Sequence, residues 1–140
     1  MKYVYLITSI IFICSYYKQS VSIKNKDNVT NYEMMKSGTF IQQIKNHKAS
    51  AEYYMILKDS LRIEYSEKGK YFTKSIITRN SKATFTSIAY ESSIPGFNNN
   101  IKELVETEIL ETSTKDSLIL IRERSQNSKW SKFLLKKIKS

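Results

Sequence analysis

The chain has 140 residues, a formal net charge of +10, one cysteine and one histidine. This length suits a single domain. The scarcity of cysteine and histidine excludes a disulfide-stapled scaffold and a zinc site built from thiolates and imidazoles. The lysines are spread along the chain, so the charge predicts a diffuse solvated surface and not a dense basic block.

The N-terminus carries an export pattern. Met1-Lys2 is followed by an apolar run over 3–14 and then by the small residue Ser15, as in a secretory signal peptide. The run is shorter than the roughly 20 apolar residues that span a bilayer. We therefore predict a signal peptide over 1–15 and an exported protein that is periplasmic, associated with the outer envelope, or secreted.

Alternatives remain open at this end of the chain. Ser20-Val21-Ser22 is a second candidate cleavage site, and a retained N-terminal anchor is a third interpretation. Cys14 is a candidate lipidation site, although Ile13 stands where such a signal normally has Gly, Ala or Ser. We expect the protein to contact a membrane only through its N-terminus, and only if Cys14 is acylated. Residues 16–37 are polar and weakly patterned, and they predict a flexible leader.

Short β-type runs separated by polar turns fill the rest of the chain. We predict strands over 38–44, 52–58, 61–65, 71–78, 83–90, 101–112, 118–124 and 130–138. In the clearest one, Leu61, Ile63 and Tyr65 alternate with Arg62 and Glu64. This period predicts the first three in the core and the other two in water.

One run is ambiguous between helix and strand. The apolar residues of 101–112 fit a helical stripe as well as a strand, but its threonines and the neighbouring hairpins favour a strand. Consecutive strands joined by short turns pair antiparallel. Eight of them make an up-and-down meander, which hides its edges best by curling.

We therefore predict one all-β domain over 38–138, rolled or closed as a small lipocalin-like barrel. A closed barrel suits a small apolar or amphipathic ligand in its interior. An open sheet would instead offer its concave face to an envelope protein or a glycan. Both interpretations describe a non-enzymatic binding or envelope-associated module.

Few residues qualify for catalysis. His47 is the only histidine and lies in a predicted polar turn, so it makes neither a metal site nor a shielded triad base. The densest acidic cluster contains Glu103, Glu106, Glu108 and Glu111. We interpret it as a solvated strand face that balances lysines, and the alternative is a small hydrolase with paired carboxylates. We predict no catalytic residues, no metal and no cofactor.

Two arginines and two tyrosines are candidate ligand-binding residues. Arg62 and Arg122 each follow one copy of the repeated turn that reads Lys-Asp-Ser-Leu, at 58–61 and 115–118. Arginine binds carboxylates in a bidentate way, so these two either lie on an exposed strand face or line a rolled sheet and meet an anionic ligand or an internal glutamate. Tyr54 and Tyr71 belong to aromatic runs that contain lysine and could stack bases. Export argues against a nucleic-acid partner.

The stretch Met35-Lys36-Ser37-Gly38-Thr39-Phe40 resembles the F-K-T-G-x-F opening of a family of small exported bacterial β-proteins. Many members are lipoproteins, and they are often mislabelled as topoisomerase IV. The similarity continues through Arg62-Ile63-Glu64-Tyr65 and ends in the basic last run, 135–138. Members typically carry two cysteines that this chain lacks. The resemblance implies an exported antiparallel β domain of unknown activity, with no catalytic residues.

Overall fold

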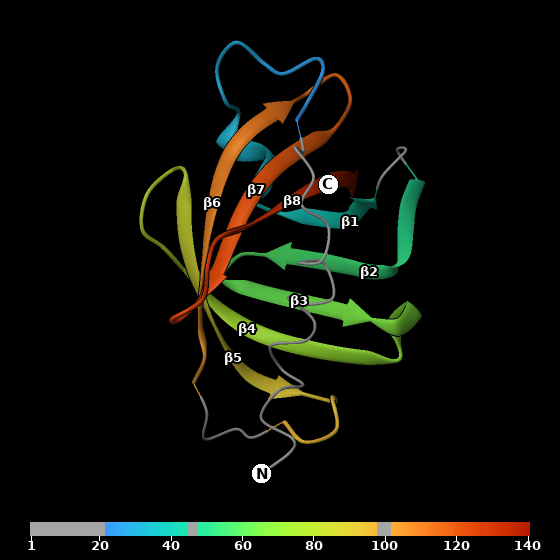
Figure 1. The fold of residues 1–140 in the computed structure, drawn as a ribbon, viewed down its shortest axis with the longest axis vertical. Helices are drawn as coiled ribbons and strands as arrows, with labels where there is room; N and C mark the ends of the chain where they lie inside the picture. The colour runs from blue at the N-terminus through green and yellow to red at the C-terminus, as the bar shows by residue number, and fades with distance from the viewer. Residues whose placement is uncertain (1–21, 45–47, 98–101) are drawn as a thin grey trace.

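A closed eight-stranded barrel forms the body of the molecule (Figure 1). The computed structural model describes residues 22–44, 48–97 and 102–140. The strands are β1 (Gly38–Ile44), β2 (Lys48–Lys58), β3 (Leu61–Ser66), β4 (Tyr71–Arg79), β5 (Thr84–Ser92), β6 (Leu104–Ser113), β7 (Leu118–Ser125) and β8 (Ser131–Lys139). Each strand pairs antiparallel with the next, and β8 pairs with β1. The predicted all-β meander is confirmed, in its closed form.

The strand boundaries follow the predicted runs closely. The ambiguous run is a strand, since β6 pairs with β5 on one side and β7 on the other. β2 is longer than predicted and begins at Lys48. The predicted signal peptide, Cys14 and His47 lie outside the described residues.

Glycine is required at the start of β1. Gly38 has a φ of 132°, and a Cβ at this position would overlap the backbone carbonyl of Lys139 on β8. A side chain is therefore excluded where the first and last strands meet. The closure of the barrel therefore explains why residue 38 is a glycine.

A short 3-10 helix, η1 (Tyr32–Met35), closes one end of the barrel. Its residues Met34 and Met35 are buried in the hydrophobic core. Arg79 Nη2 donates to the carbonyl of Met35 (3.0 Å), and Lys137 Nζ donates to that of Met34 (3.2 Å). The rest of the core cluster comprises Phe40, Met55, Leu57, Ile77, Phe85, Ile109, Ile119, Ile121, Phe133 and Leu135. The half of the interior beside η1 is therefore apolar and filled with side chains.

The leader does not behave as predicted. Residues 16–37 were expected to be flexible, whereas the described part, 22–37, is docked on the barrel. The backbone N–H of Asp27 donates to the Thr112 carbonyl (2.7 Å), and the Asp27 carboxylate accepts from Thr112 Oγ1 (2.7 Å). Ile23 is buried as well. Polar composition concealed this docking because the anchors are a carboxylate and one isolated apolar side chain.

The orientation of β3 also differs from the prediction. Arg62, predicted to face water, is 1% exposed, whereas Leu61, Ile63 and Tyr65 are only partly buried. The period of two is correct, but the two faces are exchanged. The exchange occurs because the far wall of the barrel supplies a carboxylate partner for Arg62.

Candidate functional site

A buried ion-pair network crosses the barrel interior. Arg62 on β3 binds Glu123 on β7 in a bidentate way, through Nη1 to Oε1 at 2.8 Å and Nη2 to Oε2 at 3.3 Å. Nη2 also donates to Oε1 of Glu64 at 2.8 Å. One guanidinium thus bridges two opposite walls and holds two carboxylates. The bridge fixes the inward register of both strands.

Two hydroxyl groups complete the network. Thr107 Oγ1 donates to Oε1 of Glu123 (2.8 Å), and the phenol of Tyr53 donates to Oε1 of Glu64 (2.6 Å). Burial raises the pKa of Tyr53 well above its ordinary value, and the nearby charge of Glu64 raises it further. Tyr53 therefore remains a hydrogen-bond donor.

The guanidinium keeps its charge in spite of burial. Desolvation acts to lower the pKa of Arg62, but Glu123 and Glu64 outweigh it and raise the pKa well above the ordinary value. One positive and two negative formal charges give the network a formal charge of −1. In the low-dielectric interior of the barrel, this excess negative charge strongly attracts cations and repels anions.

One polar atom of the network has no partner. Among the described residues, Arg62 Nε is the only buried side-chain nitrogen or oxygen without a hydrogen bond. Its cross-strand neighbour on β4 is Ser75, whose side chain is buried, and Ser87 on β5 is buried too. A donor and small hydroxyl-bearing side chains therefore lie on the inner face of this wall.

The network is partly exposed to solvent at Glu64. The side chain of Glu64 is 18% exposed, whereas those of Arg62 and Glu123 are nearly inaccessible. Glu64 lies nearer than Arg62 in the chain to the 3-10 helix η3 (Glu67–Gly69), which follows β3. Its neighbour on β4 is Thr73, whose hydroxyl lies 2.9 Å from that of Ser92 on β5. These polar side chains mark the approach to the network.

The second predicted arginine lies outside the barrel. Arg122 on β7 forms an ion pair with Glu108 on β6, and its guanidinium lies 4.5 Å from the ring centroid of Trp130. Arg124 repeats the arrangement with Glu106 and the same ring at 4.6 Å. Arg62 and Arg122 therefore do not form a shared site, because Arg62 lies inside the barrel and Arg122 lies on its outer face.

The acidic cluster does not converge. Glu106 and Glu108 hold arginines on the outer face, and Glu111 lies 3.5 Å from Lys26 of the leader. The prediction that this face balances lysines holds for Glu111 and Lys26 only, because Glu106 and Glu108 are paired with arginines. Among the described residues, no group of three or more His, Cys, Asp or Glu side chains is placed to hold a metal ion.

The two predicted tyrosines do not join Arg62. Tyr54 stacks on its cross-strand neighbour Tyr65, with ring centroids 4.5 Å apart. Tyr71 lies under the ammonium of Lys70, 4.8 Å from the ring centroid. Tyr54 faces outward, because its neighbour Tyr53 reaches the interior network and successive side chains alternate.

The alternative in which Arg62 meets an internal glutamate agrees with the structure, but sequence reasoning did not identify Glu123, Thr107 or Tyr53 as members of the network. Ile119, Ile121 and Glu123 are spaced two residues apart, so strand alternation predicts that Glu123 lies on the same apolar face of β7 as the two isoleucines. That spacing was a usable signal for a buried carboxylate. No comparable signal existed for Tyr53 or Thr107, since both residue types are common on either face of a strand.

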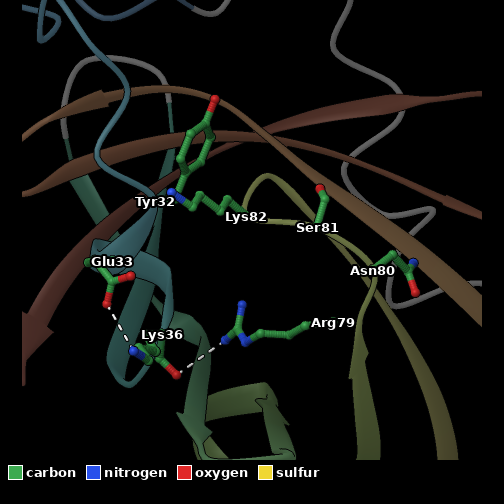
Figure 2. A pocket seen from close by; sticks show the side chains of 7 residues that line it. All are labelled: Tyr32, Glu33, Lys36, Arg79, Asn80, Ser81 and Lys82. Carbon is green, nitrogen blue, oxygen red and sulfur yellow. Dashed lines mark hydrogen bonds and ion pairs between the residues drawn. The ribbon is translucent and has the colours of Figure 1, made fainter.

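A separate pocket of about 280 Å³ lies outside the barrel, beside η1 (Figure 2). It is lined by Tyr32, Glu33, Lys36, Arg79, Asn80, Ser81 and Lys82. Glu33 neutralises Lys36 at 3.1 Å, and Arg79 donates to the Lys36 carbonyl at 3.2 Å. Two of its cations are thus occupied in holding η1, and the pocket is structural in character.

Membrane-spanning helices are not found in the described ranges, where every helix is too short or too polar to cross a bilayer. Comparisons with protein-family models, with curated proteins and with solved structures find no match to this chain.

Proposed function

We propose that this chain is an exported, non-enzymatic binding protein that admits a small polar ligand into the barrel from the end opposite η1. The observation that carries the proposal is the unpartnered Nε of Arg62, buried inside a closed barrel. A buried donor without an acceptor costs about 1–3 kcal/mol. A hydroxyl or carbonyl oxygen of a ligand would accept that hydrogen bond.

The charge of the network selects among ligands. Two carboxylates face one guanidinium, and the more exposed carboxylate, Glu64, lies on the approach. An anionic head group would be repelled by this excess, whereas a neutral or cationic one would be accepted. The apolar half of the interior is filled by core side chains, so the contact with the ligand is polar.

Two features support binding without turnover. The carboxylates of the network are occupied by Arg62, Thr107 and Tyr53, which leaves no unpaired base there to abstract a proton. Three glutamates of the acidic cluster, Glu106, Glu108 and Glu111, are engaged in ion pairs with basic side chains. These paired carboxylates are poorly suited to act as the general base that hydrolysis needs.

The binding proposal is tested by head-group selectivity. The chain contains four arginines, whose Nε–H groups give separate NMR signals. We expect 1-butanol and protonated 4-amino-1-butanol, each of which has a hydroxyl oxygen that can accept from Nε–H, to shift the Arg62 signal and leave that of Arg122 unmoved. Butyrate should bind at least about tenfold more weakly, the equivalent of about 1.4 kcal/mol. Equal binding of all three probes, or a shift confined to Arg122, would contradict the proposal.

A matched pair of variants separates site electrostatics from overall charge. Glu64→Gln removes the carboxylate on the approach, and Glu67→Gln removes one on η3 that pairs with Lys70 at the surface. We expect protonated 4-amino-1-butanol to bind more tightly than 1-butanol to the parent and to E67Q, and we expect E64Q to lose this preference. The same loss in both variants would show that the preference reflects net charge alone.

Export is tested independently by mass spectrometry of the mature N-terminus. Cleavage after Ser15 leaves a chain that begins at Tyr16. A mature protein that retains Met1 would contradict the export part of the proposal.

A further inference from the structure

The outer face of the barrel carries an apolar row across four strands. Leu61 on β3 pairs with Ile76 on β4, Ile76 pairs with Ile88 on β5, and Ile88 pairs with Leu104 on β6. Ile76 is 57% exposed and Ile88 is 37% exposed. Single exposed apolar residues are ordinary, but a contiguous row marks an interaction surface.

An aromatic row lies on the same outer side. Tyr54, Tyr65 and Phe72 are consecutive cross-strand neighbours on β2, β3 and β4, and the two tyrosine rings are stacked. Tyr90 on β5 is exposed as well. We call these two rows together the outer apolar face.

Basic side chains accompany the outer apolar face. Lys58 is the cross-strand neighbour of Leu61, and Lys74 lies 5.2 Å from the ring centroid of Phe72. Among the outward-facing side chains of β3, β4 and β5, all of them described, the only acidic one is Glu91, which Lys74 binds at 2.9 Å. On β6, which contributes Leu104, the outward-facing Glu106 and Glu108 are paired with Arg124 and Arg122. The stems of lysines can cover apolar surface while their ammonium groups reach outward.

We propose that the outer apolar face docks on the surface of an anionic lipid bilayer. Tyrosines and exposed isoleucines suit the boundary between head groups and acyl chains, and adjacent lysines suit anionic head groups. The net charge of +10 adds long-range attraction to such a surface. A second copy of the chain is less well matched, because a two-fold contact brings the lysines of this face toward their own copies. This docking is independent of ligand binding in the barrel.

Vesicle sedimentation with the full-length chain tests the proposal. Vesicles of phosphatidylcholine with phosphatidylglycerol are compared with vesicles of phosphatidylcholine alone. The double variant Ile76→Ser, Ile88→Ser removes the centre of the outer apolar face. Ile138→Ser on β8 is the matched control, because Ile138 is 53% exposed. The N-terminus is identical in all variants, so its own contribution to binding cancels.

We expect the double variant to bind anionic vesicles about tenfold or more weakly than the parent, and I138S to change binding less than about twofold. Binding should weaken at high salt and on vesicles without phosphatidylglycerol. Circular dichroism checks that the double variant is folded. Should it fail to fold, Lys58→Glu replaces it, with an expected loss of about fivefold or more against Lys139→Glu as control.

Two results would overturn the proposal. One is a folded double variant that binds anionic vesicles as the parent does. The other is sedimentation velocity in which the parent is a dimer and I76S, I88S is a monomer, with vesicle binding unchanged. That second result would assign the outer apolar face to a second copy of the chain.

Discussion

The barrel has two walls whose outer faces differ in polarity. On β6, β7 and β8 the outer face carries the ion pairs of Arg122 and Arg124, and on β3, β4 and β5 it carries an apolar row. The inner faces of both walls mix apolar and polar side chains, since Ile121 and Glu123 are both buried on β7 and Ser75 and Ile77 are both buried on β4. A period of two therefore identifies a strand, but the opposite wall decides which face is inside.

Two arginines express the contrast in energetic terms. Arg62 is buried between two carboxylates, and Arg122 shares an outer face with Glu108 and Trp130. A buried charge that loses its partner is costly, whereas an exposed pair adds little. An arginine therefore contributes strongly to stability inside the barrel and weakly on its outer surface.

The largest expected effect comes from the two arginines. Arg62→Ala leaves Glu123 and Glu64 buried without their cation and should lower the free energy of unfolding by about 3–5 kcal/mol. Arg122→Ala should lower it by less than about 1 kcal/mol. Urea unfolding followed by circular dichroism measures both. Similar losses in the two variants would remove the distinction between the walls.

Isoleucines on the two walls give the next effect. Ile121→Ala on the inner face of β7 should cost about 3 kcal/mol, because it leaves a cavity in the core cluster. Ile76→Ala on the outer face of β4 should cost less than about 1 kcal/mol, since Ile76 is largely exposed. Thermal and urea unfolding test the pair. A larger loss for I76A would place β4 the other way round.

A smaller effect is expected at Tyr53. Tyr53→Phe removes the donor to Glu64 and should cost about 1–2 kcal/mol at neutral pH. The folded state raises the pKa of Tyr53, so the stability that the protonated phenol confers is complete below the unfolded pKa. It is lost as the pH rises above about 10, at about 1.4 kcal/mol per pH unit.

Alkaline unfolding of Y53F is therefore expected to fall less steeply than that of the parent. Tyr54→Phe serves as the control, because Tyr54 is stacked on Tyr65 at the outer face. Identical alkaline slopes for Y53F and the parent would exclude a buried phenol as the titrating group.

The smallest and most local effect concerns the leader, residues 22–37, at the point where Asp27 docks on Thr112 of β6. Hydrogen bonds from Thr112 and from the backbone N–H of Thr114 lower the pKa of the Asp27 carboxyl. The stability from this carboxylate is present above its unfolded pKa and is lost as the pH falls through the lower folded value. The protection factor of the Asp27 amide, which donates to Thr112, should fall in acid. Asp27→Asn should exchange fast already at neutral pH; slow exchange there would show that the carboxylate is not the anchor.

Much of the fold follows from local signals. Apolar alternation and polar turns predict eight antiparallel strands, because short connections leave no other pairing. Even the ambiguous run became β6 for this reason, with partners on both sides. Closure does not follow in the same way, because a meander of this length can cover its two edges either by rolling or by closing.

The site follows far less from the sequence. Arg62 and Glu123 are separated by 61 positions, and no local pattern reports such a pairing. The alternation of Leu61, Ile63 and Tyr65 predicts the wrong inner face because the outer face of β3 is itself apolar. Parity with Ile119 and Ile121 was the one available clue to Glu123. Long-range electrostatic partners are set by topology, and only the assembled barrel reveals them.

The seam between β1 and β8 has a consequence for the order in which the protein is made. Thr39 pairs with Lys139, so the free edge of β1 is covered only after β8 has been synthesised. Until then the growing polypeptide carries two open edges, which are sites of aggregation for any sheet. The chain therefore gains from being kept unfolded until β8 is available to close the barrel.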